Sequence, residues 1–269
     1  MTGMQDARLL DVRSLGVAAA DGTPLVHDVS LTVEPGERVG LIGESGSGKS
    51  LTSFAVTGLL PSGLTASGSA ILDGVEVVGA RERDLVPLRG RTASVVFQEP
   101  LTALDPLMRL GKQVAAPLKR HLGLRGAALR SAVLDALSEV SLTDPERIAK
   151  AYPHEISGGQ RQRVAIAAAL ACRPRLLIAD EPTTALDVTV QDEILTLLDS
   201  LVAERAMALL FVSHDLAVVA RMTDRALVLR QGRVVEAGAV ETLLSAPTDP
   251  YTVELVRSAR ALDAALEVS

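Results

Sequence analysis

Alternating apolar and polar positions dominate the first part of the chain. Residues 8–33 alternate on both sides of Asp21 and Gly22, a turn signal, which predicts an antiparallel hairpin. An uninterrupted apolar run at 38–42 is typical of a buried strand, and residues 51–60 contain no proline and predict a helix. The chain therefore opens with strands and then turns from a strand into a helix.

The middle of the chain changes from strand signals to helical spacing. Residues 68–78 predict a second hairpin, and 95–97 predict a short buried strand that ends at Gln98. From about residue 104 to 172 strand signals give way to helical spacing, and a second helix is predicted over 128–140. The first helix has Leu110, Val114, Leu118 and Leu122 at four-residue steps, with Pro117 as a predicted kink or break. This stretch predicts helices inserted between the strands of a core.

The last part of the chain returns to alternating strands and helices. Residues 176–179 and 209–212 are aliphatic runs of the buried-strand type, separated by a helix with an apolar side over 190–201. A hairpin is predicted over 226–236. The pattern predicts an α/β fold with a mainly parallel sheet, an antiparallel β layer from the N-terminal hairpins, and an inserted helical subdomain.

Composition narrows the classes of function. The chain has 269 residues, of which 48% are hydrophobic but only 2% aromatic, so aliphatic side chains must fill a sizeable core. The net charge of −6 argues against a general nucleic-acid-binding surface. The one cysteine, Cys172, cannot form an internal disulfide, which fits a reducing, cytoplasmic compartment.

The sequence shows no signal for secretion or for crossing a membrane. The N-terminus has no charged-then-apolar leader, and no stretch of about 18 apolar residues occurs. Any membrane role is therefore expected to be peripheral.

A phosphate-binding loop organises the rest of the chain. It fits the pattern G-x-x-x-x-G-K-[ST] at every required position, between the predicted strand at 38–42 and the predicted helix. Glycines let successive N–H groups curve around an anion, and the following helix start favours negative charge. The residues expected to contact nucleotide are Gly43, Glu44, Ser45, Gly46, Ser47, Gly48, Lys49, Ser50 and Leu51.

Two of these residues have specific expected roles. Lys49 is expected to reach the β- and γ-phosphates, and the Ser50 hydroxyl to ligate Mg²⁺. The strand–loop–helix setting predicts a P-loop NTPase core and disfavours the alternative, an ordinary glycine-rich turn. Kinases, GTPases, helicases and transport ATPases share this loop, so it does not choose between them.

Two further groups carry candidate chemistry. Asp180 and Glu181 end a buried strand, where ligands of α/β sheets bind, so Asp180 is a candidate Mg²⁺ ligand and Glu181 a candidate base for the attacking water. The alternative is a pair of carboxylates on a solvated turn. A small-residue helix start at Ser157, Gly158, Gly159 and Gln160 predicts a second anion site, or a plain N-cap at Ser157.

Together these motifs resemble the ATP-binding cassette ATPases of ABC transporters over nearly the whole chain. In that family the segment 156–160 corresponds to the signature motif, which binds the γ-phosphate of the nucleotide held by the other subunit. The resemblance implies that two ATP molecules are sandwiched at a dimer interface, so that each loop is one half of a shared site.

The resemblance assigns three more residues. Gln98 resembles the glutamine of the Q-loop, which contacts Mg²⁺ and the attacking water. Asp187, after Ala185 and Leu186, resembles the D-loop aspartate at the dimer interface, and as an alternative or in addition it caps the next helix. His214 resembles the switch histidine, which contacts the γ-phosphate and pairs with the catalytic glutamate.

A narrower resemblance points to the peptide and nickel importer branch. Its segments are Phe97 to Pro100, Ala103 to Pro106, Gly111 to Gln113, His154-Glu155 and Pro250 to Thr252. The chain stops at Ser269 without the cysteine-bearing extension of longer relatives, which resembles the shorter members.

One region departs from the family. The cassette usually places an aromatic residue in the early strands to stack on adenine, whereas residues 16–20 contain none. Base stacking contributes about 1–3 kcal/mol in nucleic-acid sites. We therefore expect weaker discrimination between ATP and GTP, unless Val17 or another apolar residue takes the place of the aromatic.

The resemblance implies the ATP-hydrolysing subunit of an importer for peptides, nickel or a related small solute. The expected cassette domain covers 8–250, with the helical subdomain at about 104–172 and a short C-terminal tail at 251–269. Expected partners are membrane permease subunits, a second ATPase of the same or another kind, and a solute-binding protein. Rivals are an exporter subunit, a small-molecule kinase, and a soluble cassette ATPase in translation or DNA repair.

Overall fold

The computed structural model describes residues 8–98, 103–184 and 186–266. It divides into two compact units. The first contains the chain up to Leu85 and from Ala208 onward, and the second contains Val86–Met207.

The N-terminal hairpins of the first unit form an antiparallel sheet with the strand order β2-β1-β4-β5. The predicted turn at Asp21 and Gly22 is confirmed, because the Gly22 N–H donates to the Ala19 carbonyl at 2.9 Å. The strands are β1 (Leu10–Ala19), β2 (Pro24–Val33), β4 (Leu64–Leu72) and β5 (Val75–Glu76).

The buried runs of the first unit pair in parallel. Strand β3 lies between β8 and β9 and runs parallel to both, and β10 pairs antiparallel with β9. Val39, Leu41 and Ile42 of β3 are fully buried, as expected for a strand covered on both faces. The bounds are β3 (Arg38–Ile42), β8 (Ala208–Ser213), β9 (Arg225–Arg230) and β10 (Arg233–Ala239).

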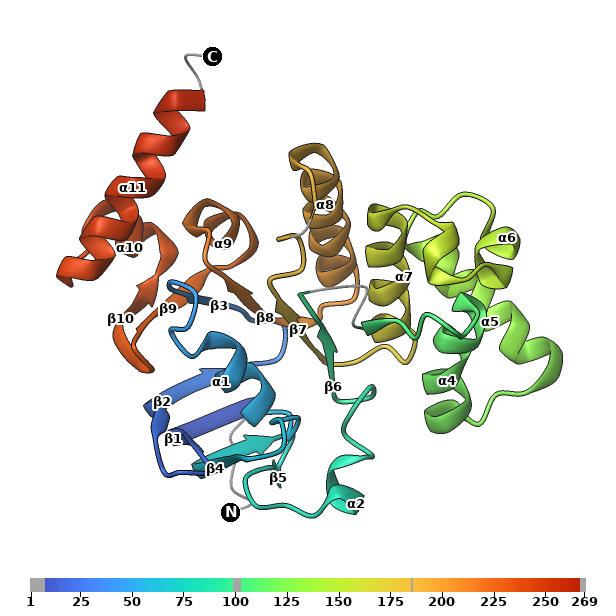
Figure 1. Cartoon of the computed structure of the whole chain (residues 1–269), viewed down its shortest axis with the longest axis horizontal. Helices are drawn as coiled ribbons and strands as arrows, with labels where there is room; N and C mark the ends of the chain where they lie inside the picture. Colours follow the sequence, from blue (N-terminus) through green and yellow to red (C-terminus); the bar gives the residue numbers. More distant parts are fainter. Residues whose placement is uncertain (1–7, 99–102, 185, 267–269) are drawn as a thin grey trace, which may run out of the picture. The chain divides into compact units, whose positions relative to one another are not determined.

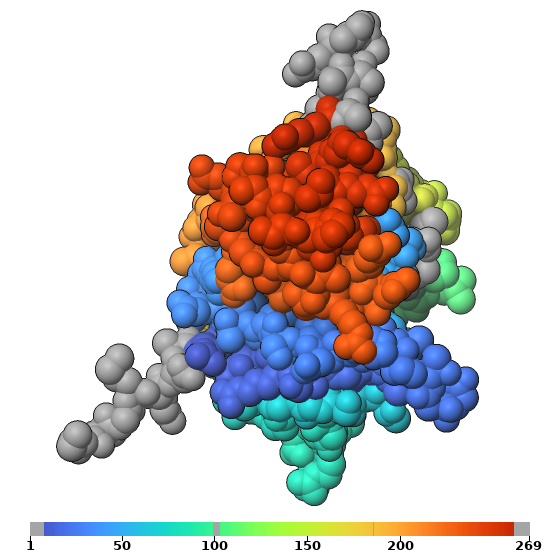
Figure 2. Space-filling view, turned by 90° about the vertical axis from the view of Figure 1, so that its left-hand side faces the viewer, coloured from blue at the N-terminus to red at the C-terminus, as the bar shows by residue number. Residues whose placement is uncertain are grey.

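Helices cover these strands. Helix α1 packs beside β1 and β2, α9 packs on β3 and β8, and α11 packs against α9 and β10 (Figure 1). Figure 2 shows a face on which the C-terminal helices, in orange and red, lie above the blue N-terminal strands. The helices are α1 (Lys49–Ala55), α2 (Glu82–Leu85), α9 (Leu216–Met222), α10 (Val240–Ser245) and α11 (Pro250–Leu266).

The described part of the C-terminal segment is helical. Residues 251–269 were expected to be a short tail, but the described part belongs to α11. Proline is well suited to the first position of a helix, and Tyr251 and Val256 are only 3% and 4% exposed. Packing of these side chains therefore holds the helix.

A carboxylate on β10 anchors the start of α11. Glu236 accepts hydrogen bonds from the Thr248 N–H and hydroxyl at 2.8 Å and from the Asp249 N–H at 3.1 Å. Partial burial raises the pKa of Glu236, but the neighbouring Thr252 hydroxyl and these donors outweigh it and lower the pKa to about 2. The ionised form thus stabilises the fold.

This anchor makes stability depend on pH. Because the pKa of Glu236 in the folded state lies below its ordinary value of 4.5, the stabilisation is complete above about pH 4.5 and is lost as the pH falls toward 2. We expect Glu236→Gln to have a lower free energy of unfolding than wild type at pH 7. This difference should disappear as the pH falls from about 4.5 toward 2. Urea unfolding from pH 7 to pH 2 measures it, with exposed Glu241→Gln as control. A gap that does not change with pH would contradict the assignment.

The second unit contains a parallel strand pair and a group of helices. β6 (Ala93–Val96) runs parallel to β7 (Leu176–Asp180). The predicted helical segment is confirmed, and α4 continues through Pro117 without a break, with Val114 and Leu118 buried beside it. The helices are α4 (Leu110–Leu122), α5 (Gly126–Glu139), α6 (Pro145–Lys150), the 3₁₀ turn η1 (Pro153–Glu155), α7 (Gly158–Leu170) and α8 (Val188–Glu204).

Candidate functional site

The phosphate loop connects the end of β3 to the start of α1 in the first unit. Gly43, Gly46 and Gly48 all have positive φ, at 154°, 80° and 98°. At Gly43 a Cβ atom would lie 2.1 Å from the Leu229 carbonyl oxygen of β9, so any side chain is excluded there. The predicted strand–loop–helix is confirmed, although α1 begins at Lys49 and ends at Ala55, five residues before the expected end.

The Lys49 side chain folds back over the loop. Lys49 is 4% exposed, and its Nζ donates to the Gly43 carbonyl at 2.7 Å and the Glu44 carbonyl at 2.9 Å. A buried ammonium group requires such acceptors. The positive charge is therefore held inside the curve of the loop, where an anion would be bound.

Ser47 supplies an observation that fits a phosphate ligand. Its hydroxyl is buried, and within the described part of the chain its Oγ has no hydrogen-bond partner. A buried polar atom without a partner is costly unless a ligand or water satisfies it. Ser50 and Leu51 lie on the first turn of α1 and are half-buried. They are the last two of the residues expected from the sequence to contact nucleotide.

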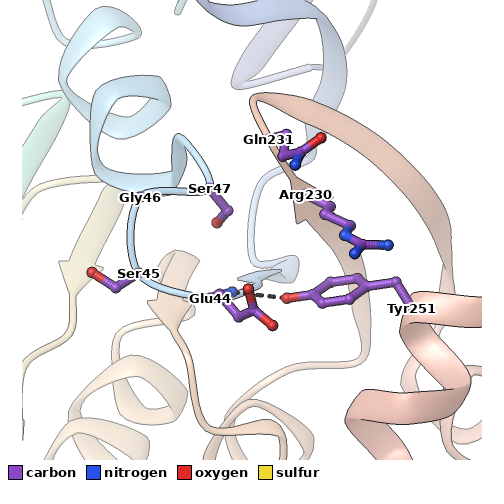
Figure 3. Close-up of a pocket in the computed structure, with 7 residues that line it drawn as sticks. All are labelled: Glu44, Ser45, Gly46, Ser47, Arg230, Gln231 and Tyr251. Atoms are coloured by element: carbon purple, nitrogen blue, oxygen red, sulfur yellow. Dashed lines mark hydrogen bonds between the residues drawn. The ribbon is translucent and has the colours of Figure 1, made fainter.

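A polar recess of about 120 Å³ flanks the loop (Figure 3). The first four residues after Gly43 form one wall, and the turn between β9 and β10 and the start of α11 form the others. The Glu44 N–H donates to the Tyr251 phenolic oxygen at 2.9 Å. From the sequence, Tyr251 was expected only as part of the segment that resembles the importer branch, and its contact with the loop was not expected.

The predicted carboxylate pair ends β7 in the second unit. Asp180 is 3% exposed, and Glu181 is half-buried and has a φ of 47°, a strained conformation for a residue with a side chain. The Glu181 carboxylate accepts a hydrogen bond from the Thr184 hydroxyl at 2.9 Å and from the Gln98 side-chain amide at 3.3 Å. The structure thus brings Gln98 and Glu181 together.

Thr184 is a site residue that the sequence analysis missed. Its hydroxyl lies within hydrogen-bond distance of Glu181 because the chain turns between these residues, with the Thr184 N–H 3.4 Å from the Glu181 carbonyl oxygen. A hydroxyl residue three positions after the glutamate was the available signal.

The signature segment begins α7. Ser157 and Gln160 form a reciprocal cap: the Gln160 N–H donates to Ser157 Oγ at 3.2 Å, and the Ser157 N–H donates to Gln160 Oε1 at 3.1 Å. Gly158 and Gly159 occupy the first turn between them. The N-cap interpretation of Ser157 is confirmed, and its nucleotide-binding role remains a prediction.

The two signature glycines differ in their surroundings. A Cβ atom on Gly159 would lie 2.8 Å from Val190 Cγ1 of α8, whereas one on Gly158 has nothing closer than 3.8 Å. We expect Gly159→Ala to lower the free energy of unfolding by about 1–3 kcal/mol, because a stiff valine must move. Gly158→Ala should be neutral or slightly stabilising, since alanine favours a helix. Urea unfolding compares them, and equal stabilities would contradict the close packing.

Asp187 caps α8, since its carboxylate accepts the Val190 N–H at 3.0 Å. The capping interpretation is therefore confirmed, whereas the interfacial role stays a prediction. Ala185 of the same segment, like Glu99 and Pro100 of the importer segments, lies outside the described residues. His214 follows β8 in the first unit and is exposed, next to Asp215, the N-cap of α9.

The donor chemistry at two positions suits magnesium. Ser50 offers a hydroxyl oxygen and Asp180 a carboxylate, the hard oxygen ligands that Mg²⁺ prefers. Over the residues that the structure describes, histidine, cysteine and carboxylate side chains do not gather in threes as they would at a protein-only metal site.

The region expected to hold adenine lies at the end of β1. Val17 is 2% exposed, so its side chain belongs to the core and is a poor replacement for a stacking aromatic. Ala18 and Ala19 are half-buried and offer little surface.

The chain resembles characterised sequences over most of its length. Residues 26–184 match the ABC transporter family. The peptidoglycan transport ATP-binding protein YejF of Agrobacterium fabrum is 47% identical over 92% of this chain and 46% of that protein. The oligopeptide transport ATP-binding protein OppD of Salmonella typhimurium is 45% identical over 95% of this chain and 77% of that protein. The chain thus spans less than half of the first relative.

Solved structures match as well. The cassette cbiO1 of Clostridium perfringens has a TM-score of 0.76 at 27% identity, covering 96% of this chain and 100% of that one. The dimeric structure of MJ0796, a bacterial ABC transporter cassette, has a TM-score of 0.75 at 30% identity, and the match covers 86% of this chain and 98% of that one. Among the helices that the structure describes, none is both long and apolar enough to cross a membrane. The sequence and structure matches agree, and this chain belongs to the ABC transporter family of ATP-binding cassettes.

Proposed function

We propose that this chain is the ATP-hydrolysing subunit of an ABC importer for peptides, nickel or a related small solute. The observation that carries the proposal is the phosphate loop, in which Lys49 is held over two loop carbonyls and Ser47 keeps a buried hydroxyl for a ligand. The match of residues 26–184 to the ABC transporter family supports it.

The loop residues 43–51 bind the triphosphate through backbone N–H groups and the Lys49 ammonium. Ser50, Gln98 and Asp180 would hold Mg²⁺, which neutralises charge on the β- and γ-phosphates when bound. Glu181 acts as the general base that takes a proton from the attacking water. Gln98 and Thr184 orient its carboxylate through their hydrogen bonds.

The nucleotide is shared between two cassettes. Ser157, Gly158, Gly159 and Gln160 bind the γ-phosphate held by the partner ATPase, and Asp187 lies at the same interface. His214 contacts the γ-phosphate and pairs with the catalytic glutamate. Dimeric structures of MJ0796, one of them bound to ADP and Pi, support this arrangement.

The transported solute is proposed from the relatives. OppD of Salmonella typhimurium and Haemophilus influenzae is an oligopeptide transport protein, and each is at least 43% identical to this chain. We assign the cassette domain to residues 8–250, with the helical subdomain at about 104–172 and the C-terminal segment at 251–269. The protein works at the cytoplasmic face of the membrane with permease subunits and a solute-binding protein.

Co-purification tests the proposal. The tagged full chain is extracted in mild detergent from its own cells, and its partners are identified by mass spectrometry. We expect to identify permease subunits. The Lys49→Ala variant should co-purify with the same partners, because the phosphate loop is proposed to bind nucleotide and not the permease. A complex that contains ribosomal or DNA-repair proteins and no membrane protein would contradict the transporter assignment.

A further inference from the structure

One peptide unit of the phosphate loop is held at both ends. The Gly43 carbonyl accepts the Lys49 ammonium at 2.7 Å, and the N–H of the same peptide, on Glu44, donates to the Tyr251 phenolic oxygen at 2.9 Å. In a trans peptide the C=O and N–H point in opposite directions. The lysine and the tyrosine therefore fix the orientation of this peptide from its two opposite sides.

Tyr251 is itself firmly held. It is 3% exposed, and the Arg230 guanidinium lies 4.8 Å from the centre of its ring (Figure 3). Its own N–H donates to the Asp249 carboxylate at 2.8 Å. Burial raises the pKa of Tyr251, so the phenol stays neutral through the physiological range. The acceptor of the Glu44 N–H is thus a rigid group that belongs to the start of α11.

On its other side the loop rests on strand β9 and on the turn between β9 and β10. The Gly232 N–H of the β9–β10 turn donates to the Ser47 carbonyl at 3.0 Å, and Gly43 lies against the Leu229 carbonyl. The recess beside Tyr251 has a volume of about 120 Å³, which is enough to admit water. If the phenolic oxygen were absent, the Glu44 N–H could turn toward that water, and the Gly43 carbonyl would turn away from Lys49.

We propose that Tyr251 is a positioning residue of the phosphate loop. Its oxygen holds the Gly43–Glu44 peptide so that the Gly43 carbonyl faces Lys49, which keeps the ammonium in place for the nucleotide phosphates. Through this bond the C-terminal helix α11 stabilises the nucleotide-binding form of a loop that lies 207 residues earlier. The inference rests on the proposed function, because it concerns how the ATP-binding loop is held.

Tyr251→Phe removes only the oxygen and keeps the ring under Arg230. The chain has one other tyrosine, Tyr152 in the second unit, whose ring has the Arg109 guanidinium 5.5 Å from its centre. Tyr152→Phe is therefore a matched control. The dissociation constant of a non-hydrolysable ATP analogue with Mg²⁺ is measured on the full-length variants, together with KM and kcat for ATP hydrolysis and amide hydrogen exchange of the loop.

We expect Tyr251→Phe to raise the dissociation constant and KM about 3- to 10-fold, as for loss of one hydrogen bond, with kcat close to wild type. The Glu44 amide should exchange faster in Tyr251→Phe, whereas Tyr152→Phe should match wild type in all of these values. An affinity equal to wild type in Tyr251→Phe, or a fall in kcat at constant KM, would overturn the inference alone. Failure of wild type to bind the analogue would overturn the proposed function and this inference with it.

Discussion

Lys49→Ala is expected to weaken binding of ATP and Mg²⁺ by about 10- to 100-fold, because hydrogen bonds to a charged group contribute about 1.5–3 kcal/mol. Lys49 is the cation that the loop encloses, and alanine removes the contact between its ammonium group and the triphosphate. The same change also removes the hydrogen bonds that the Lys49 ammonium donates to the Gly43 and Glu44 carbonyls. Isothermal titration with a non-hydrolysable analogue measures the loss.

The control for this change is Lys119→Ala, which removes an exposed lysine from α4. Both variants are compared by thermal unfolding without nucleotide, since Lys49 is buried and its removal also affects the fold. We expect a loss of affinity in Lys49→Ala that the control does not share. Equal affinities in the two variants would exclude Lys49 from phosphate binding.

Glu181→Gln is expected to reduce turnover about 10²- to 10⁴-fold while ATP binding stays close to wild type. Glutamine has nearly the same size as glutamate, and its carbonyl oxygen can still accept the hydrogen bond from the Thr184 hydroxyl. It cannot take a proton from the attacking water, so the chemical step is lost selectively. Phosphate release at saturating ATP measures turnover, and titration measures binding.

A matched control exists on α8. A carboxylate oxygen of Glu193 lies 2.8 Å from the Arg163 guanidinium, and the Glu193 side chain is 56% exposed. Glu193→Gln therefore removes a carboxylate that lies in the same unit as Glu181 but has no proposed catalytic role. We expect Glu193→Gln to hydrolyse ATP at a rate near wild type. Near-normal hydrolysis by Glu181→Gln would remove Glu181 from its role as base.

Local features of the fold were predictable from the sequence. The buried strand, the loop and the start of α1 follow one another within residues 38–55, and each is encoded by its own apolar run or glycine. The cap at Ser157 and Gln160 was likewise predictable, because both partners lie within four residues. Helix α11, whose segment was expected only as a short tail, packs against α9 and β10.

Contacts between distant residues could not be predicted. Tyr251 and Glu44 are 207 positions apart, and only the folded chain brings the phenolic oxygen to the loop. Gln98 and Glu181 are 83 positions apart, and the resemblance named both without predicting their hydrogen bond. The strained backbone at Glu181 is a further example, since a φ of 47° at a glutamate has no signature in the sequence.

Peptide movement across a sealed membrane tests the central claim most directly. Vesicles carry the complete transporter with this chain, and a labelled peptide is supplied on the opposite side together with the solute-binding protein. We predict that ATP and Mg²⁺ on the side of this chain drive the peptide toward that side, and that Glu181→Gln stops it. Movement in the opposite direction, or uptake that continues in Glu181→Gln, would contradict the account.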